Sequence, residues 1–223
     1  MVFAFLAACL LFGCAVKAPL SPQMGTFHLS QKIPARAALL IPENKRDYVF
    51  KCKPPGASSM FPHHFPLGLA MERASLDAFS QIFEQVAVVR DKEAASAHAL
   101  VVEPVIVNFH FRYTRAAARM AVAKIRLKLT LRMDETIIWE QAVETEGEKA
   151  LRLFNITSEE EMGAAASKAL ESAVEELALQ MAVDPGIRAN VARHPVPSPN
   201  PANPKSPETE APPAPARPLL FGD

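Results

Sequence analysis

The chain has 223 residues with 24 basic and 24 acidic side chains, so its formal net charge at neutral pH is zero. A balanced charge gives no electrostatic reason to expect nucleic acid as a partner. Hydrophobic residues make up 49% of the sequence, which suits one domain with a sizeable core plus appendages. Its 20 prolines are about twice the ordinary share of about 5%.

Residues 1–16 are almost wholly apolar, and the first charged side chain is Lys17. The run is shorter than the roughly 20 residues that span a bilayer as a helix, and it is typical of the apolar region of a secretory signal peptide. No Lys or Arg precedes it, so the usual positive segment is missing unless translation starts further upstream. An ordinary cleaved signal or a short buried helix are the alternatives to the interpretation that follows.

Leu11-Phe12-Gly13-Cys14 resembles the lipobox of bacterial lipoproteins, in which a small residue precedes the cysteine that is acylated and becomes the new N-terminus. Leu6-Ala7-Ala8-Cys9 fits the same pattern but would leave a leader of only eight residues. We therefore predict a signal peptide at 1–13 and palmitate-type lipidation of Cys14, with Cys9 as the alternative. Ala15 stands where an aspartate is associated with inner-membrane retention, so the resemblance implies the periplasmic face of the outer membrane.

The next segments are expected to be a tether and the start of one α/β domain. Residues 14–35 are polar with several prolines and predict a tether, and "RAALLI" at 36–41 predicts a buried strand that opens a domain at 36–183. A proline-rich loop at 42–66 follows, of a length that is usually functional or mobile. Helical spacing predicts a helix at 67–85 with Glu72 on its solvated side. A strand at 86–90 and the polar connection "DKEAASA" come next.

Three strands with alternating side chains are predicted after this connection. The first, at 99–113, places Val105, Val107, Phe109 and Phe111 on one face, and Pro104 predicts an edge position or a bulge. The second, at 120–133, has an apolar face and a basic face, as expected for a half-buried antiparallel strand. The third, at 137–145, alternates apolar residues with glutamates.

The register of the last two strands follows from their side chains. A two-residue turn at 134–135 would place Leu129 opposite Glu140 on the core face. A three-residue loop at 134–136 instead pairs Leu131 with Trp139 and sets Arg126 opposite Glu144. Opposite charges across strands contribute about 0.2–1 kcal/mol. We therefore predict the three-residue loop.

A second helix and a tail complete the chain. Thr157 to Glu161 form a capping-box pattern with carboxylates near the helix start, and the helix is predicted to end at about Val183. Residues 184–223 are proline-rich with few apolar side chains, which predicts a disordered, extended tail. The fold class expected is α+β: a mainly antiparallel sheet of four to five strands with two helices packed on one face.

Metal binding and catalysis receive little support from the sequence. Cys52, His63 and His64 share the 42–66 loop, with His28 earlier in the chain, but their spacing matches no common structural site. We expect ordinary loop residues, no metal and no cofactor. No glycine-flanked nucleophile, phosphate-binding loop or paired-histidine zinc motif is present in the sequence, so no enzyme is expected.

Two segments are candidates for partner binding. The basic strand face, with neighbouring His110, suits an anionic partner such as peptidoglycan, lipid headgroups or an acidic protein; its members are Arg112, Lys124, Arg126, Lys128 and Arg132. The alternative is a solvated face neutralised by Glu140, Glu144 and Glu146. Leu219, Leu220 and Phe221 give the tail an apolar tip that suits a docking motif, or a frayed end.

The order of these elements resembles the small α/β domains of bacterial envelope lipoproteins, such as penicillin-binding-protein activators and the curli secretion lipoprotein. The residues that carry the resemblance are "AALLIP", "LGLAMERASLDAFSQIFEQVAVV", "AHALVVEPVIVNF" and "LKLTLRMDETIIW". In the activators the linker precedes the domain, whereas the long tail here follows it. The resemblance implies a non-catalytic accessory or scaffold role in an envelope complex. A lipoprotein that binds a small ligand or metal through the 42–66 loop is the alternative, and the oligomeric state is open.

Overall fold

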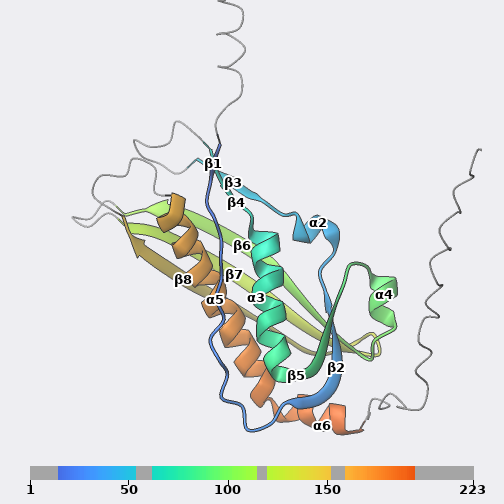
Figure 1. Ribbon diagram of the computed structural model, residues 1–223. Helices are drawn as coiled ribbons and strands as arrows, with labels where there is room; N and C mark the ends of the chain where they lie inside the picture. The colour runs from blue at the N-terminus through green and yellow to red at the C-terminus, as the bar shows by residue number, and fades with distance from the viewer. Residues whose placement is uncertain (1–14, 54–61, 115–119, 152–158, 194–223) are drawn as a thin grey trace, which may run out of the picture.

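The computed structural model describes residues 15–53, 62–114, 120–151 and 159–193 (Figure 1). Two sheets and a set of helices make up this part of the chain. A five-stranded sheet has the order β5-β2-β6-β7-β8, with strands Phe83–Val89, Ile33–Leu40, Leu100–Tyr113, Met120–Met133 and Thr136–Ala150. A small sheet has the order β1-β4-β3, with strands Val16–Lys17, His63–Phe65 and Phe50–Cys52. The helices are α2 (Glu43–Arg46), α3 (Leu67–Ile82), α4 (Lys92–Ser96), α5 (Glu159–Val183) and α6 (Pro185–Arg193).

The large sheet is mixed, not mainly antiparallel. Strand β2 runs parallel to both β5 and β6, whereas β6, β7 and β8 form an antiparallel meander. Parallel neighbours need a crossover connection, and α3 supplies it between β2 and β5. The sequence pattern does not distinguish parallel from antiparallel pairing here, because a short apolar strand such as β2 is compatible with either direction.

Strand β2 is buried on both faces, which explains its unbroken apolar run. Ala37 and Leu39 belong to the main core with α3 and α5, while Ala38 and Leu40 form a second cluster with Ala95 of α4. The connection "DKEAASA" is therefore a short helix that covers the opposite face, capped by Asp91 Oδ1, which accepts from the Ala94 N–H at 2.6 Å. Helices α3 and α5 share the main core, whereas α4 belongs to the second cluster, so the helices are not confined to one face as predicted.

The β6 strand contains a bulge that reverses its faces. Ile106 pairs with Leu127 and Asn108 with Arg126, so Val107 is the extra residue. Its side chain is 52% exposed, whereas Phe109 and Phe111 are buried. Val105 lies opposite Lys128 on the basic face, so the prediction that Val105 and Val107 share a face with Phe109 and Phe111 is wrong. The bulge lies three residues beyond Pro104, in a part of β6 that β2 no longer pairs with.

The hairpin register is confirmed, but the loop length is wrong. Leu131 lies opposite Trp139 and Arg126 opposite Glu144, as the charge and core pattern predict. The turn nevertheless has two residues, Asp134 and Glu135, both with positive φ (47° and 68°) as a type I′ turn requires. A bulge next to the turn, between the Arg132–Ile137 and Leu131–Trp139 pairs, shifts the register by one residue. This shift gives the pairing that a three-residue loop was predicted to give.

The segment predicted as a tether is packed onto the helices. Residues 18–32, here called the strap, run between β1 and β2 across α5 and α3 (Figure 1). Ser21 N–H donates to Ser167 Oγ at 3.0 Å and Phe27 N–H to Gln81 Oε1 at 2.8 Å. Ala18 and Leu20 are buried in the main core. The polar composition of the strap reflects hydrogen bonds to helix side chains, so residues 15–35 belong to the domain.

The chain also stays folded past Val183, where α5 ends as predicted. Helix α6 occupies the start of the segment predicted as a disordered tail, and its Ile187 and Val191 are buried in the main core. Asp184 Oδ1 accepts from the Gly186 and Ile187 N–H groups at 2.8 and 3.1 Å, which caps the new helix. The domain therefore reaches Arg193, and the capping box predicted at 157–161 starts outside the described residues.

Candidate functional site

The predicted 42–66 loop supplies most of the small sheet. Strands β3 and β4 pair antiparallel, and β1 adds to the other side of β4. Because alternate residues of a strand point to opposite faces, the pairing forms two rows of side chains. Val16, His63 and Cys52 make up one row, and Lys17, His64 and Lys51 make up the other.

The first row is turned toward the protein interior. His63 is buried and lies edge-on to Phe111 and Tyr113, with ring centroids 6.3 and 6.2 Å away. Neither ring nitrogen of His63 has a hydrogen-bond partner among the described residues. Burial lowers the pKa of His63, with a smaller opposing effect of Glu159. Burial also raises the pKa of the Cys52 thiol to about 11. This row is therefore an apolar environment that favours neutral side chains.

Two of the three metal candidates are brought together and the third is separated from them. Cys52 and His63 lie opposite each other across the strands, whereas His64 is on the other face. His28 lies on the strap next to Phe27, beside the C-terminal end of α3. Within the described residues, no cluster of three or more histidine, cysteine or acidic side chains fits a metal ion. A raised thiol pKa also opposes metal binding, which needs the thiolate.

The second row, which we call the lysine row, faces away from the core. Lys17 and Lys51 are exposed and flank His64, and the exposed Lys53 follows directly after β3. The row brings together residues that lie up to 47 positions apart in the sequence. No pattern in the sequence predicts it, because each strand contributes only one residue.

The basic face of β7 is a ladder of ion pairs. Lys124 pairs with Glu144 at 2.5 Å, Lys128 with Glu140 at 3.3 Å, Arg112 with Glu146 at 3.6 Å and Arg132 with Glu103 at 3.0 Å. The hydrogen bond from Lys124 lowers the pKa of Glu144, and hydrogen bonds from Thr130 and Lys128 lower that of Glu140. Within the described part of the chain, no ion pair is found for Arg126, although Glu144 lies opposite it. The solvated, neutralised face is thus the arrangement present.

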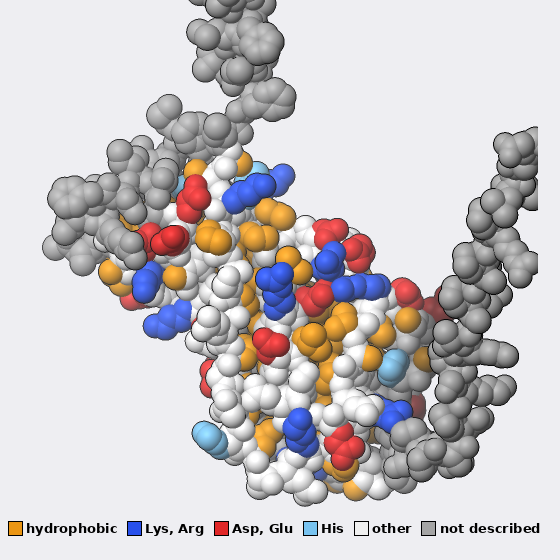
Figure 2. All heavy atoms as spheres, in the orientation of Figure 1, with side chains coloured by type: hydrophobic (Ala, Val, Ile, Leu, Met, Phe, Trp, Pro, Cys, Tyr) orange, Lys and Arg blue, Asp and Glu red, His pale blue; other side chains and the backbone are white. Residues whose placement is uncertain are grey.

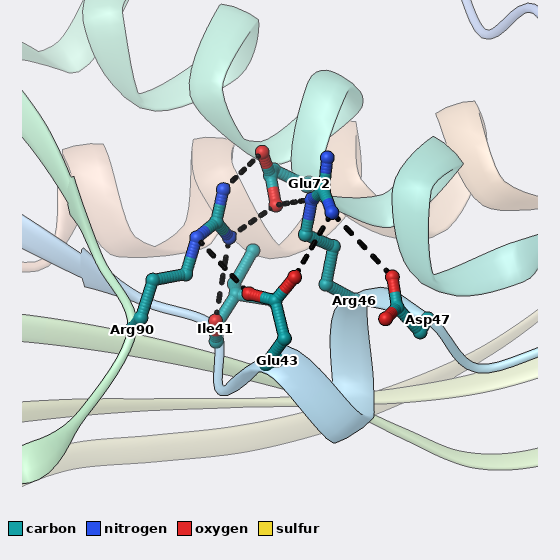
Figure 3. A network of polar contacts seen from close by, with 6 residues as sticks. All are labelled: Ile41, Glu43, Arg46, Asp47, Glu72 and Arg90. Atoms are coloured by element: carbon teal, nitrogen blue, oxygen red, sulfur yellow. Dashed lines mark hydrogen bonds and ion pairs between the residues drawn. The ribbon is translucent and has the colours of Figure 1, made fainter.

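A second charged cluster was missed by the sequence analysis (Figure 3). Arg90, at the end of β5, donates to both carboxylate oxygens of Glu72, at 2.5 and 2.9 Å, and to the Ile41 carbonyl at 3.4 Å. Arg46 of α2 approaches the same carboxylate at 3.6 Å. The hydrogen bond from Arg90 lowers the pKa of Glu72. This network joins α2, α3 and the β5 end, so we assign it a structural role.

A cleft with a volume of about 700 Å³ lies between α4 and the β7–β8 hairpin. Its lining includes Lys92, His98, Arg132, Asp134 and Ile137. Arg132 is held by Glu103, and the remaining charges are of both signs. The cleft has no convergent set of groups that would define a ligand class.

The remaining sequence-predicted sites, Cys9, Cys14, Leu219, Leu220 and Phe221, lie outside the described residues. None of the helices in the described ranges is long and apolar enough to cross a membrane.

Comparisons with known proteins identify a related fold. No family model and no curated protein matches this sequence. Among solved structures, protein XCC0632 from Xanthomonas campestris, of family DUF330, is 12% identical with a TM-score of 0.52, covering 81% of this chain and 99% of that chain. At this identity the likeness shows a shared fold and nothing about activity.

Weaker similarities are found to two lipoproteins. The minor lipoprotein from Acinetobacter baumannii is 11% identical, covering 72% of this chain and 95% of that chain with a TM-score of 0.37. Lipoprotein GNA1162 from Neisseria meningitidis is 13% identical, covering 68% of this chain and 100% of that chain with a TM-score of 0.32. These scores are too low to support a statement about this chain.

Proposed function

We propose that the chain is a lipoprotein acylated at Cys14, held on the periplasmic face of the outer membrane, and that it serves as a non-catalytic component of a cell-envelope complex. The observation that supports this best is the position of Cys14. It follows a leader-like apolar run and lies two positions before Val16, the first buried residue in the described part of the chain. Cleavage before Cys14 would leave the whole described fold intact, as a mature lipoprotein requires.

The contacts of the charged side chains support a non-catalytic accessory role. The strongest carboxylate–guanidinium contact, between Glu72 and Arg90, holds elements of the fold together. On the basic face, an anionic partner would have to replace existing ion pairs such as Lys124 with Glu144. Among the described residues, Arg126 is the member of this predicted face for which no ion pair is found, although its charge helps to lower the pKa of Glu144. Peptidoglycan or an acidic protein would therefore dock first around Arg126.

Metabolic labelling with a fatty-acid analogue tests the anchor. We expect labelling of the wild-type chain and of Cys9→Ser, and loss of labelling in Cys14→Ser. Loss in Cys9→Ser alone would move the anchor to that cysteine, and labelling of neither chain would refute the proposal. Crosslinking in intact cells tests the accessory role: a specific adduct that depends on residues 194–223 or on Arg126 supports it.

The second candidate function is metal binding, favoured only by the position of Cys52 opposite His63. Cu⁺ is the metal to test, because it prefers soft ligands and tolerates two-coordinate sites. Equimolar copper retained through purification and lost in both Cys52→Ser and His63→Phe would support this function. His64→Ala is the matched control, since its side chain lies on the opposite face.

A further inference from the structure

The N-terminal segment leaves no free length between a lipid on Cys14 and the folded domain. Strand β1 is fixed on both sides of Lys17, because the Val16 N–H donates to the Pro62 carbonyl at 3.0 Å and the Ala18 N–H to the His64 carbonyl at 2.9 Å. Next, the Pro19 carbonyl packs directly on Gly163 of α5. The attachment of the segment is therefore continuous from Val16 onward.

Only Ala15 lies between Cys14 and Val16, and the two steps from Cys14 to Val16 span at most about 7 Å when fully extended. We infer that the domain lies directly against the bilayer, with the end that carries β1, β3 and β4 facing the phospholipid headgroups. This inference rests on the acylation of Cys14 proposed above. A tether of 22 residues, as the sequence alone predicts, would have allowed any orientation.

The charge of this end suits phospholipid headgroups. The lysine row and Lys53 present ammonium groups on the outer face of the small sheet. Figure 2 shows basic side chains beside a histidine at this end of the molecule. Lysine side chains close to an anionic membrane surface are attracted to it electrostatically. The exposed carboxylates at the same end, Glu148, Glu159 and Glu160, lie on β8 and α5 and not on the small sheet.

The course of α5 shows which end of the domain would face away from the membrane. Helix α5 begins near the small sheet, where the Tyr113 hydroxyl donates to Met162 Sδ and the Tyr113 ring lies beside His63. Its 25 residues extend for about 37 Å and lead into α6, at the far end of the domain (Figure 1). Arg193, the last described residue, is thus turned away from the membrane. The proline-rich segment that follows it starts on the side available to a partner in the periplasm.

Fluorophores at the two ends of α5 test this orientation. The chain is purified in acylated form with Cys52→Ser, so that an introduced cysteine carries the only free thiol, and is placed in vesicles of neutral and anionic phospholipids with spin-labelled headgroups. Glu160→Cys and Val183→Cys supply the two exposed positions. We expect most of the fluorescence at position 160 to be quenched and that at position 183 to persist, because contact quenching does not act across the roughly 35 Å of helix between them.

A second variant tests the missing tether. Ten Gly/Ser residues inserted between Ala15 and Val16 add a flexible link of about 18 Å, so quenching at position 160 should fall by at least half. Lys51→Glu should reduce the same quenching in anionic vesicles, whereas Lys92→Glu, an exposed position of α4 near the opposite end of β6, should not.

The possible failures are distinguishable. Mass spectrometry that finds no lipid on Cys14 overturns the proposed function and the orientation with it. Lipid on Cys14 together with equal quenching at positions 160 and 183, or with quenching unchanged by the insertion, overturns the orientation alone.

Discussion

Replacing Gly163 with alanine tests whether the strap is part of the fold. In an exposed helix interior this change stabilises a protein by about 1 kcal/mol, because alanine has the higher helix propensity. Here the new methyl group would overlap the Pro19 carbonyl, which is backbone and has no rotamer to adopt. The strap would have to move away from α5.

The cost of that movement follows from what the strap buries. Val16 and Leu20 lie on either side of Pro19 and are 6% and 8% exposed. Burying one such side chain fully stabilises a fold by about 1.5–3 kcal/mol, and overpacking costs about 1–3 kcal/mol. Partial displacement of both residues outweighs the propensity gain. We therefore expect Gly163→Ala to lower the free energy of unfolding by about 2–4 kcal/mol.

Urea unfolding of the chain without its leader, followed by circular dichroism and by fluorescence of the single tryptophan, Trp139, measures this change. The neighbouring exposed position provides the control: Ala164→Gly should lower stability only by the propensity difference of about 1 kcal/mol. If Gly163→Ala is as stable as the wild type, or more stable, the strap does not pack on α5 as described.

Three further predictions concern other parts of the fold. Glu72→Gln should cost about 1–2 kcal/mol at neutral pH, because it removes the bidentate partner of the partly exposed Arg90. The pKa of Glu72 is lowered in the fold, so its carboxylate stabilises the fold only where it is ionised. The difference in unfolding free energy between wild type and Glu72→Gln should therefore be constant near neutral pH and shrink as the pH falls below about 4.3. Urea titrations at several pH values measure this difference. Glu135→Gly should raise the melting temperature by relieving about 1 kcal/mol of positive-φ strain. Truncation after Val183 should destabilise the chain by about 2–4 kcal/mol, whereas truncation after Arg193 should not, because Ile187 and Val191 are buried.

Each of these predictions has a matched control. Glu43→Gln removes an exposed carboxylate of the same network and should change stability by less than about 1 kcal/mol. Thr136→Gly places glycine in extended backbone beside the turn and should destabilise the hairpin. Equal effects of the Glu72 and Glu43 changes, a destabilising Glu135→Gly, or a chain ending at Val183 with wild-type stability would each contradict the corresponding explanation.

The sequence alone determined those elements whose pattern is local. In β7, alternation predicts both faces, since a period of two residues fixes which side chains share a face. The pairing of Arg126 with Glu144 follows from the same pattern in β8. The end of α5 at Val183 is predicted because Asp184, Pro185 and Gly186 favour termination.

Of the candidate site, the sequence predicted a lipidation motif at Cys14 and the basic face of β7, but not the lysine row. The lysine row exists only because β1, β3 and β4 pair, and two-residue and three-residue strands carry too little pattern to be recognised. Glu72 was assigned to the solvated side of α3 by helical spacing. Only the approach of Arg90, 18 residues later, makes it part of a network.

Tertiary structure alone decided the strap and α6, which the sequence predicts as a tether and a disordered tail. Both segments carry only scattered apolar side chains, and they are ordered because these side chains join the main core and distant partners satisfy their polar groups. Ser167 and Gln81 do this for the strap, and the Arg188 guanidinium of α6 donates to the Gln31 carbonyl at 3.1 Å. The composition of a segment gives only the amount of apolar surface that it carries. Order in these two segments also depends on hydrogen bonds to residues up to 157 positions away, which composition does not predict.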